Sequence, residues 1–488
     1  MISYWLPTKS IKERVYIPKY YNPQIQARLD SLRPTHDIVK ISSLIDDDIL
    51  EVNTGHEIGK LAYGTGDIPF VRTSDITNWE TKTAPKQGVS EDIYLDYKNK
   101  QDVQLGDILL VRDGTYLIGT NCIITELDEK IVYQSHILKI RVKNKSKLNP
   151  YLLFIIINSP LFQAQIRSVQ FTADTIDTIG NRFFDLQLAI PKDKVVQDSV
   201  IQKAQEAMKA REVGKAFIKH APTLMEESLS QNSRAPIDAF LSSSWEDILT
   251  NMHSDTVTSE FGNFETFWLD KSNIRESIYL PKYYDPDVTE EISQLARTCD
   301  CISIGKLIED GILEVNTGDE IGKMAYGTGT IPFLRTSDFS NWEIKHDPKQ
   351  GVSQEIYQAY ARKQDMKAGD ILLVRDGTYL VGTSCIVTKN DSKALYCGGL
   401  YKIRVKDEAM FDQWLLLGLL NSYIVKRQIR TKQFTRDVID TIGKRLEEII
   451  IPIPKSNAVR TQLSEKIKSI VDDRIEARKM ISSLAENI

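Results

Sequence analysis

The strongest constraint on the fold of this chain is an internal repeat. The stretch GDILLVRDGTYLIGT at residues 106–120 recurs 263 residues later, at residues 369–383, with a single Ile-to-Val change. The same offset aligns Trp5 with Trp268, and no gap is needed anywhere between the two copies. A chain built in this way folds into two copies of one unit.

Each copy predicts a domain of roughly 190 residues, which is large enough for its own core, followed by a long helix. Short apolar runs with turn signals alternate with helical patterns, so we expect a mixed α/β (α+β) fold in two tandem homologous domains. The expected boundaries are residues 1–192 and 268–455 for the domains, 193–225 and 456–488 for the helices, and 226–267 for a linker or insert.

Composition gives little positive evidence for a polyanionic ligand, because the formal net charge is −5. However, the 226–267 segment holds eight acidic residues and one arginine, so the rest of the chain carries +2. The five cysteines, of which only Cys122 and Cys385 are equivalent, fit neither a disulfide framework nor a zinc site. We expect no bound metal. With no export signal and no apolar run long enough to span a bilayer, we expect a soluble, cytoplasmic protein.

The repeated stretch predicts a β-hairpin. The run Ile108–Val111 is typical of a buried strand, Asp113-Gly114 supplies turn chemistry, and residues 116–124 favour a returning strand. The polar residues at its end are an ordinary turn or a binding site, and their retention in both copies indicates only a shared constraint. These candidates are Arg112, Asp113, Thr115 and Tyr116, with Arg375, Asp376, Thr378 and Tyr379 in the second copy.

A second polar loop follows a strand expected at residues 69–71. Arginine can fork onto guanine, asparagine onto adenine, and serine or threonine onto either bases or phosphate, so its residue types suit contacts with DNA. The alternative is a capped turn in which Arg72 pairs with Asp75. The candidates are Arg72, Thr73, Ser74, Asp75, Asn78 and Trp79, with Arg335, Thr336, Ser337, Asp338, Asn341 and Trp342 in the second copy.

Towards the end of each domain we expect a strand at 136–143, helices from Asn149-Pro150 onward, a short helix around 176–179 and a strand that Pro191 stops. The aromatic segment around Tyr20 predicts an extended strap packed on the domain rather than a base-stacking platform. Basic candidates before the last strand are Arg167 in the first copy and Arg430, Lys432 and Arg436 in the second.

The terminal helices carry a coiled-coil stripe at alternating spacings of four and three residues. Small residues in one copy match larger ones in the other, which favours pairing between the helices, although a helix lying on its own domain shows a similar stripe. The stripe consists of Val200, Ala204, Ala207, Arg211, Gly214 and Ile218 in the first copy and Leu463, Ile467, Ile470, Arg474, Ala477, Ile481 and Leu484 in the second.

Two expectations follow from this stripe. Arg211 and Arg474 should each find a carboxylate or carbonyl within the helix pair or on a partner protein, because an unpaired charge there would be costly. Aspartate at Ile467 and Ile481 should abolish assembly with a partner while the separate domains remain folded.

The doubled order of RTSD loop, GDILLVRDGT and an IP-x-P element ahead of a heptad helix resembles the specificity subunit of type I restriction-modification systems, over nearly the whole chain. The resemblance implies two target recognition domains, each reading one half of a split double-stranded DNA sequence. It also implies that the two helices pair antiparallel about a pseudo-two-fold axis, separate the domains and dock methyltransferase subunits.

For partners and cofactors, the resemblance implies two methyltransferase subunits, with S-adenosylmethionine bound in them and not in this chain, and leaves a restriction subunit or another defence module open. The close likeness of the two copies predicts a nearly palindromic target with a fixed spacer. The residues named above in the two polar loops and the basic set are the candidate DNA contacts.

The sequence also argues against catalysis in this chain. It lacks a methyltransferase Asn-Pro-Pro-aromatic motif, a nucleophile elbow and a convincing nuclease cluster, and none of its six histidines is retained at the repeat offset. Two other classes stay open: an enzyme of duplicated domains, for which Arg112 with Asp113 is the only retained candidate, and a tandem that binds protein or carbohydrate. Salt-dependent DNA binding would separate these from a DNA-recognition subunit.

Overall fold

The computed structural model describes residues 5–8, 11, 15–114, 116–173, 176–254, 266–275, 277–377, 379–436 and 439–488. The side chains of residues 173, 251–254 and 436 are outside this description. The chain divides into two compact units, Met1–Arg211 with Ile475–Ile488, and Glu212–Arg474. We call them the first and the second unit.

In the first unit, a four-stranded antiparallel sheet carries the repeated stretch, and a three-stranded sheet contains one parallel pair, β3 with β9. The four-stranded sheet has the order β2 (Leu50–Thr54), β10 (Ile137–Val142), β7 (Ile108–Val111) and β8 (Asn121–Ile123). The three-stranded sheet has the order β6 (Gly88–Val89), β3 (Ile68–Val71) and β9 (Val132–Tyr133). Three strand pairs complete the unit: β1 (His36–Lys40) with β13 (Gln187–Pro191), β4 (Ile76–Thr77) with β5 (Glu80–Thr81), and β11 (Phe171–Ala173) with β12 (Ile176–Thr178).

The helices of the first unit begin where the sequence supplies caps. Asn149 accepts a hydrogen bond from the Tyr151 amide, and Pro150 occupies the first helical position, where its missing N–H costs nothing. Ser159 caps the next helix in the same way. The helices are α1 (Pro23–Leu32), α2 (Ile41–Asp46), α3 (Glu91–Gln101), α4 (Pro150–Asn158), α5 (Pro160–Val169) and the long α6 (Lys194–Ser230).

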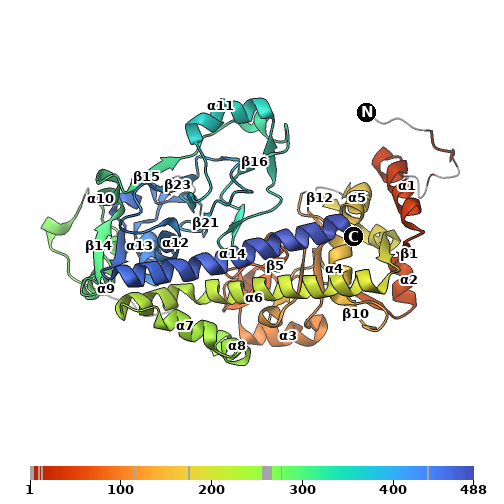
Figure 1. Ribbon diagram of the computed structural model, residues 1–488, viewed down its shortest axis with the longest axis horizontal. Coiled ribbons are helices and arrows are strands. Elements are labelled where there is room, and N and C mark those ends of the chain that lie inside the picture. Colours follow the sequence, from red (N-terminus) through yellow and green to blue (C-terminus); the bar gives the residue numbers. More distant parts are fainter. Residues whose placement is uncertain are drawn as a thin grey trace. The chain divides into compact units, whose positions relative to one another are not determined.

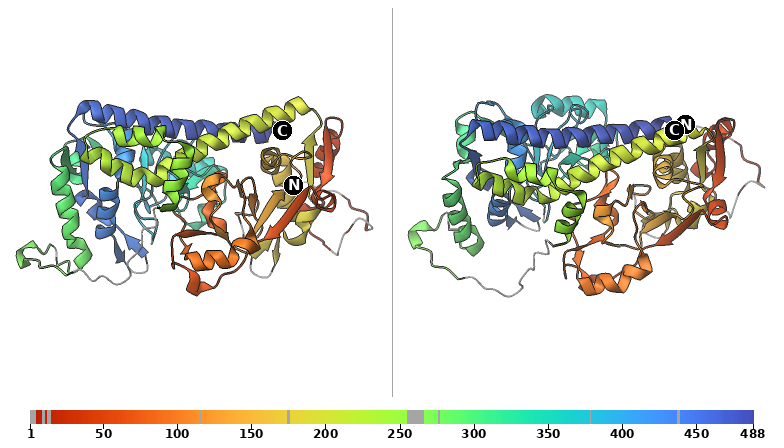
Figure 2. Two further views of the ribbon diagram at one scale, coloured as in Figure 1. Left: turned by 90° about the horizontal axis from the view of Figure 1, so that it is seen from below. Right: turned by 60° about the horizontal axis from the view of Figure 1, so that its bottom comes forward.

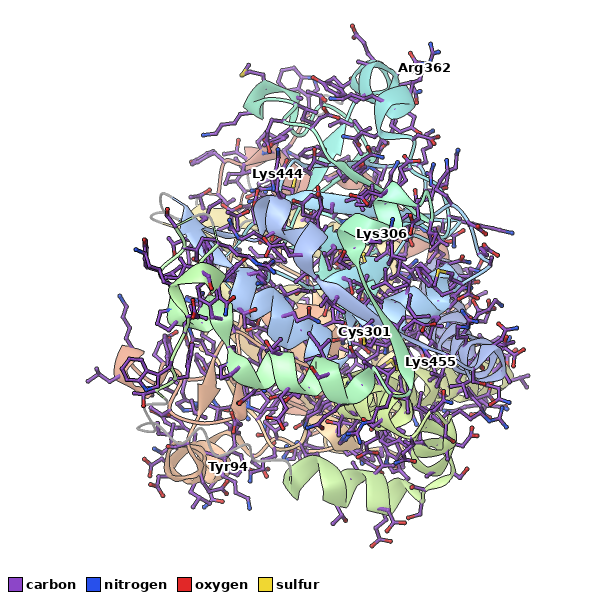
Figure 3. The ribbon with its side chains drawn as sticks, turned by 90° about the vertical axis from the view of Figure 1, so that its left-hand side faces the viewer. Tyr94, Cys301, Lys306, Arg362, Lys444 and Lys455 are labelled. Carbon is purple, nitrogen blue, oxygen red and sulfur yellow. The ribbon has the colours of Figure 1, made fainter. Side chains whose placement is uncertain are left out.

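The second unit repeats these elements in the same order. Its four-stranded sheet is β15 (Leu313–Thr317), β23 (Leu400–Val405), β20 (Ile371–Val374) and β21 (Ser384–Ile386), and its three-stranded sheet is β19 (Gln350–Val352), β16 (Ile331–Leu334) and β22 (Leu395–Tyr396). Its strand pairs are β14 (Cys299–Ser303) with β26 (Ile450–Pro454), β17 (Phe339–Ser340) with β18 (Glu343–Ile344), and β24 (Phe434–Arg436) with β25 (Ile439–Thr441). Its helices are α9 (Pro286–Leu295), α10 (Ile304–Glu309), α11 (Gln354–Gln364), α12 (Gln413–Leu420), α13 (Tyr423–Lys432) and the long α14 (Asn457–Asn487). Figure 3 shows part of this unit with side chains, including Cys301 on β14 and Lys455 directly after β26.

The long helices pair antiparallel within each unit. The first unit holds the beginning of α6 and the end of α14, and the second holds the end of α6 and the beginning of α14. In each unit the segment of α6 and the segment of α14 lie side by side (Figures 1 and 2). Ala204 and Ala207 share one hydrophobic cluster with Ala477 and Ile481, and that cluster also contains α4 and α5. The sequence left open whether the stripe pairs the two helices or packs a helix on its own domain. It does both, because it contacts the other helix and the domain at once.

The predicted stripe is buried throughout except at Leu484, which is half-buried. Ile481 belongs to the core of the first unit and Ile467 is fully buried in the second. Aspartate at either position would therefore disrupt the unit itself. The expectation that such variants leave the domains folded does not agree with this packing.

Four local expectations need correction. Residues 176–178 form strand β12 rather than a short helix, and the return strand of the repeated stretch begins only at Asn121. The first long helix ends at Ser230 instead of residue 225. The segment around Tyr20 is a 3-10 turn, Pro18–Tyr21, with Tyr20 against Phe171, rather than an extended strap.

The acidic 226–267 segment also contains folded elements. Helices α7 (Ala235–Ser242) and α8 (Trp245–Ser254) follow α6. Ile237 is fully buried, the Phe240 ring lies edge-on to Phe217 of α6, and Asp238 forms an ion pair with Lys466 of α14 at 3.0 Å. Within the second unit this part of the insert packs on the long helices and is not merely a linker.

Among the described residues, no single helix is long and apolar enough to cross a membrane, and one pair, α4 with α5, passes such a test only jointly and with a 65° bend.

Candidate DNA interface

The repeated stretch builds a charged cluster directly after its buried strand. Residues 108–111 are fully buried, and beyond them the Arg112 side chain donates two hydrogen bonds to Oδ2 of Asp113, at 3.0 and 2.7 Å. Asp113 also accepts from the hydroxyl of Thr178 on β12 and lies 2.9 Å from Nδ1 of His136. One carboxylate therefore holds together the repeated stretch, the β10 side and the β11–β12 hairpin.

The electrostatics of this cluster favour an ionised Asp113. Burial disfavours the charged carboxylate, but hydrogen bonds from Arg112, Thr178 and His136 outweigh it, so the pKa of Asp113 lies below its usual value. The Arg112 side chain is about a quarter exposed and ends at the surface, while Asp113 is buried. An arginine held by a buried carboxylate keeps its remaining donors available for an external acceptor.

The equivalent cluster of the second unit has the same arginine and carboxylate but a different surround. Nε of Arg375 lies 3.3 Å from Oδ1 of Asp376, and Nη1 donates to the Gly398 carbonyl at 3.3 Å. Gly399 stands where the first unit has His136, and the Arg375 guanidinium lies 5.7 Å from the ring centre of Tyr401. Burial raises the pKa of Tyr401. The second cluster therefore replaces a histidine contact with an aromatic one.

The RTSD loops form the capped turns that were the alternative interpretation. Nε of Arg72 lies 3.2 Å from Oδ2 of the buried Asp75, which also accepts from the Arg72 amide at 3.1 Å. In the second unit, Asp338 accepts from the Arg335 amide at 2.9 Å, and burial raises the pKa of Asp338. The arginine, threonine and serine of each loop stay at least partly exposed. Both interpretations therefore stand together, because a capped turn presents an accessible arginine.

The end of each RTSD loop lies inside the unit. Asn78, Trp79, Asn341 and Trp342 are buried and have positive φ angles between 48° and 65°. Trp79 donates from Nε1 to Oδ1 of Asn158 at 2.9 Å. Burial excludes direct DNA contact for these four side chains in this conformation, and likewise for Asp75 and Asp338. Their role is to fix the turn.

The basic set is only partly available for binding. Arg167 and Arg430 donate to Gln170 and Gln433 at 3.1 and 2.7 Å, and Arg430 also reaches the Tyr379 carbonyl. Lys432 lies 3.4 Å from the ring centre of Tyr283 and forms an ion pair with Glu448 at 3.4 Å, which assigns it a packing role. Tyr116 and Tyr379 are half-buried beside these clusters. Thr115, Thr378 and the side chain of Arg436 lie outside the described residues.

Three functional elements were missed from the sequence. The β11–β12 hairpin and its partner β24–β25 each supply a threonine bridged to the cluster aspartate, Thr178 to Asp113 and Thr441 to Asp376. Arg182 and Arg445 stack on Phe171 and Phe434 of these hairpins, at 4.5 and 4.0 Å. Glu80 and Glu343 pair with the two stripe arginines. The retained IDTIG and NWE motifs were the available signals for the hairpins and the glutamates.

Arg211 and Arg474 do find carboxylates, as expected, but not where expected. Arg211 lies 3.1 Å from Glu80 of β5, and Arg474 lies 3.3 Å from Glu343 of β18. Both carboxylates belong to the globular domain of the same copy, rather than to the helix pair or a partner protein.

The arrangement suits recognition rather than reaction. Each unit holds a partly exposed arginine beside an aspartate and a threonine, and arginine is a residue type that recognises base edges and phosphates. Among the described residues, no group of three or more His, Cys, Asp or Glu side chains could hold a metal ion.

Comparison with known proteins gives one family match for part of the chain. Residues 46–203 match the family model described as the type I restriction modification DNA specificity domain. That range contains the RTSD loop, the Arg112–Asp113 cluster and the β11–β12 hairpin, and its counterpart in the second copy is 309–466. The comparison with curated proteins finds no match.

Solved structures of specificity subunits align along most of the chain. The type I restriction-modification S subunit from M. genitalium is 11% identical, covers 92% of each chain and has a TM-score of 0.33. The HsdS subunit from Thermoanaerobacter tengcongensis is 14% identical, covers 93% of this chain and 96% of its own, and has a TM-score of 0.26. Overall superposition at these scores is poor.

The matched model is that of a DNA specificity domain, and it covers residues 46–203, about a third of the chain. More particularly, within residues 46–203 the match confirms the resemblance to type I restriction-modification specificity proteins that was drawn from the motifs.

Proposed function

We propose that this chain gives a type I restriction-modification methyltransferase its sequence specificity by binding a bipartite double-stranded DNA target. One observation carries the proposal: an arginine–aspartate pair with a bridged threonine recurs in both units, and in the second unit Thr336 of the RTSD turn and Asp376 both lie next to Gly399. Each unit then reads one half-site, with Arg112 and Arg375 as direct contacts and Arg72 and Arg335 beside them.

The antiparallel pairing of α6 and α14 supports two further parts of this proposal. We infer from this pairing an approximate two-fold relation between the two copies, so that similar units read similar half-sites in inverted order, as two-fold proteins do. The spacer between the half-sites is then set by the helices.

The proposed partners are two methyltransferase subunits, which bind S-adenosylmethionine and dock on the helix pair, with a restriction subunit as a further member. This chain supplies neither the methyl donor site nor the reacting groups. Its residues bind and orient the DNA.

The test is selection of DNA from a random duplex pool by the full chain, alone and with its co-purified subunits, followed by mapping of methylated bases in host DNA. We expect one interrupted, nearly palindromic motif and an affinity that falls steeply with salt, because phosphate contacts release counterions. If no motif is selected, the proposed function is contradicted. If the two half-sites are not inverted copies of similar sequences, only the proposed symmetry of the target is contradicted.

A further inference from the structure

A buried ion pair recurs at the same place in both units. The pairs join Arg211 to Glu80 and Arg474 to Glu343, and all four side chains are at most 5% exposed. Burying two charges is costly, and an apolar pair of similar size usually stabilises a fold at least as well. A pair kept in this position therefore calls for a reason other than stability.

The glutamate end is attached to the recognition loop. Glu80 faces Thr77 in the β4–β5 hairpin, which follows directly after the Arg72–Asp75 turn. The buried left-handed Asn78-Trp79 turn closes this hairpin, so few free torsions separate Arg72 from Glu80. A displacement of Glu80 would therefore shift Arg72, the partly exposed arginine of the loop.

The arginine of the pair belongs to a long helix and, in the second unit, packs against the other long helix. In the second unit a Cβ on Gly214 of α6 would lie 2.6 Å from both Cγ and Cδ of Arg474, so only glycine leaves room for this side chain. Glycine is the least favoured residue inside a helix after proline. Its presence here makes room for the Arg474 side chain and does not help helix stability. The Trp342 ring, next to Glu343, also lies edge-on to Phe217 of α6.

We propose that these two ion pairs, which we call the latches, are positioning elements that set the angle at which each recognition loop is presented by its long helix. The spacer length accepted between the half-sites then depends on them. A guanidinium and a carboxylate bind in a fixed planar geometry, whereas apolar side chains can slide past one another. This inference rests on the proposed function.

The experiment compares the full wild-type chain with two apolar latch variants in selection from a random duplex pool. One variant combines Arg211→Met with Glu80→Leu, and the other combines Arg474→Met with Glu343→Leu. The matched control combines Lys143→Ala with Asp48→Ala, which removes an exposed ion pair of the first unit. Thermal unfolding confirms that each variant is folded.

We expect wild type and control to select one spacer length. Each latch variant should select the same half-sites, but duplexes with neighbouring spacer lengths should also be selected. Their enrichment should come within about tenfold of that of the original spacer, which is the usual size of effect for one altered position in a site. A simple folding defect would weaken the half-sites equally and leave the spacer unchanged. Retention of a single spacer in both folded latch variants would overturn the inference.

Two further outcomes decide the remaining cases. If an apolar variant does not fold, Arg211→Lys keeps the charge but not the planar guanidinium. An unchanged spacer length in that variant would also overturn the proposed role of the latches. If the wild type selects no DNA motif, the proposed function itself fails and the inference fails with it.

Discussion

The two units share a backbone plan but differ in how they hold the recognition arginine. In the first, the Asp113 carboxylate takes two hydrogen bonds from Arg112 and one contact from His136. In the second, Arg375 makes a single, longer contact with Asp376 and lies near the Tyr401 ring. Duplication has thus kept the arginine that we propose reads DNA and has varied the residues that support it.

The largest expected effect tests whether the units unfold separately. Ile481→Asp should destabilise the first unit and Ile467→Asp the second, each by about 4 kcal/mol, because an unpaired carboxylate would enter a close-packed core. Urea unfolding with hydrogen exchange resolved by segment measures this. If either variant unfolds at the wild-type urea concentration, the packing described for that helix half is incorrect.

The next effect concerns the recognition arginines. Arg112→Ala should weaken binding at one half-site and Arg375→Ala at the other, each by about 1–3 kcal/mol, the range for an arginine forked onto guanine. Binding to duplexes mutated in one half-site at a time assigns each loss. Arg33→Ala, which removes an exposed arginine paired with Asp30, is the control. Equal losses at both half-sites would contradict the assignment of one half-site to each unit.

A smaller effect separates the units by pH. Burial lowers the pKa of Lys426 to about 8, with Arg430 contributing, whereas the equivalent residue of the first unit is the neutral Gln163. The lysine therefore destabilises the second unit below pH 8, and this penalty is relieved as the pH rises from 8 towards the unfolded value near 10.4.

Lys426→Gln should accordingly stabilise the second unit by about 1 kcal/mol at pH 7, a discounted figure because the side chain is only half-buried, and should flatten its pH dependence. Gln163→Lys is the matched change and should destabilise the first unit. Unfolding free energies at pH 7 and pH 10 measure both. The same pH dependence in the Lys426→Gln variant and the wild type would rule out this lysine as the cause.

The smallest effect tests the histidine contact. His136→Ala removes one of the donors that lower the pKa of Asp113, so the first unit should lose about 0.5 kcal/mol near neutral pH. A depressed carboxyl pKa gives stability that is present above the unfolded value near 3.9 and is lost as pH falls through the folded pKa. The difference from wild type should therefore vanish in acid. The control is Gly399→Ala, which changes the equivalent position of the second unit and places a Cβ 3.1 Å from Thr336.

The sequence predicted the duplication, the buried strand of the repeated stretch, the start of α4 and the stripe on the long helices, because each rests on local pattern or on exact repetition. It did not predict the β11–β12 hairpin. Alternation in a three-residue strand is too short to distinguish from a helical turn, and Thr178 pairs with Asp113 from 65 residues away.

The same limit applies to the site. Retained polar residues were taken together as DNA contacts, yet burial divides them, with Arg72 accessible and Trp79 enclosed. Periodicity placed Arg211 correctly on the stripe but could not name Glu80, since that partner is set by tertiary packing alone.

The latches also have a consequence for exchanging domains between related chains. Glu80 and Arg211 belong to one copy, and Glu343 and Arg474 to the other. A chimera joined in the short connection between β13 and α6 would take its glutamate from one parent and its arginine from the second, and the fit between them would be left to chance. A chimera joined after Ser230 carries a complete pair. If the latches act as proposed, DNA specificity is exchanged intact only when a domain is moved together with the helix that follows it.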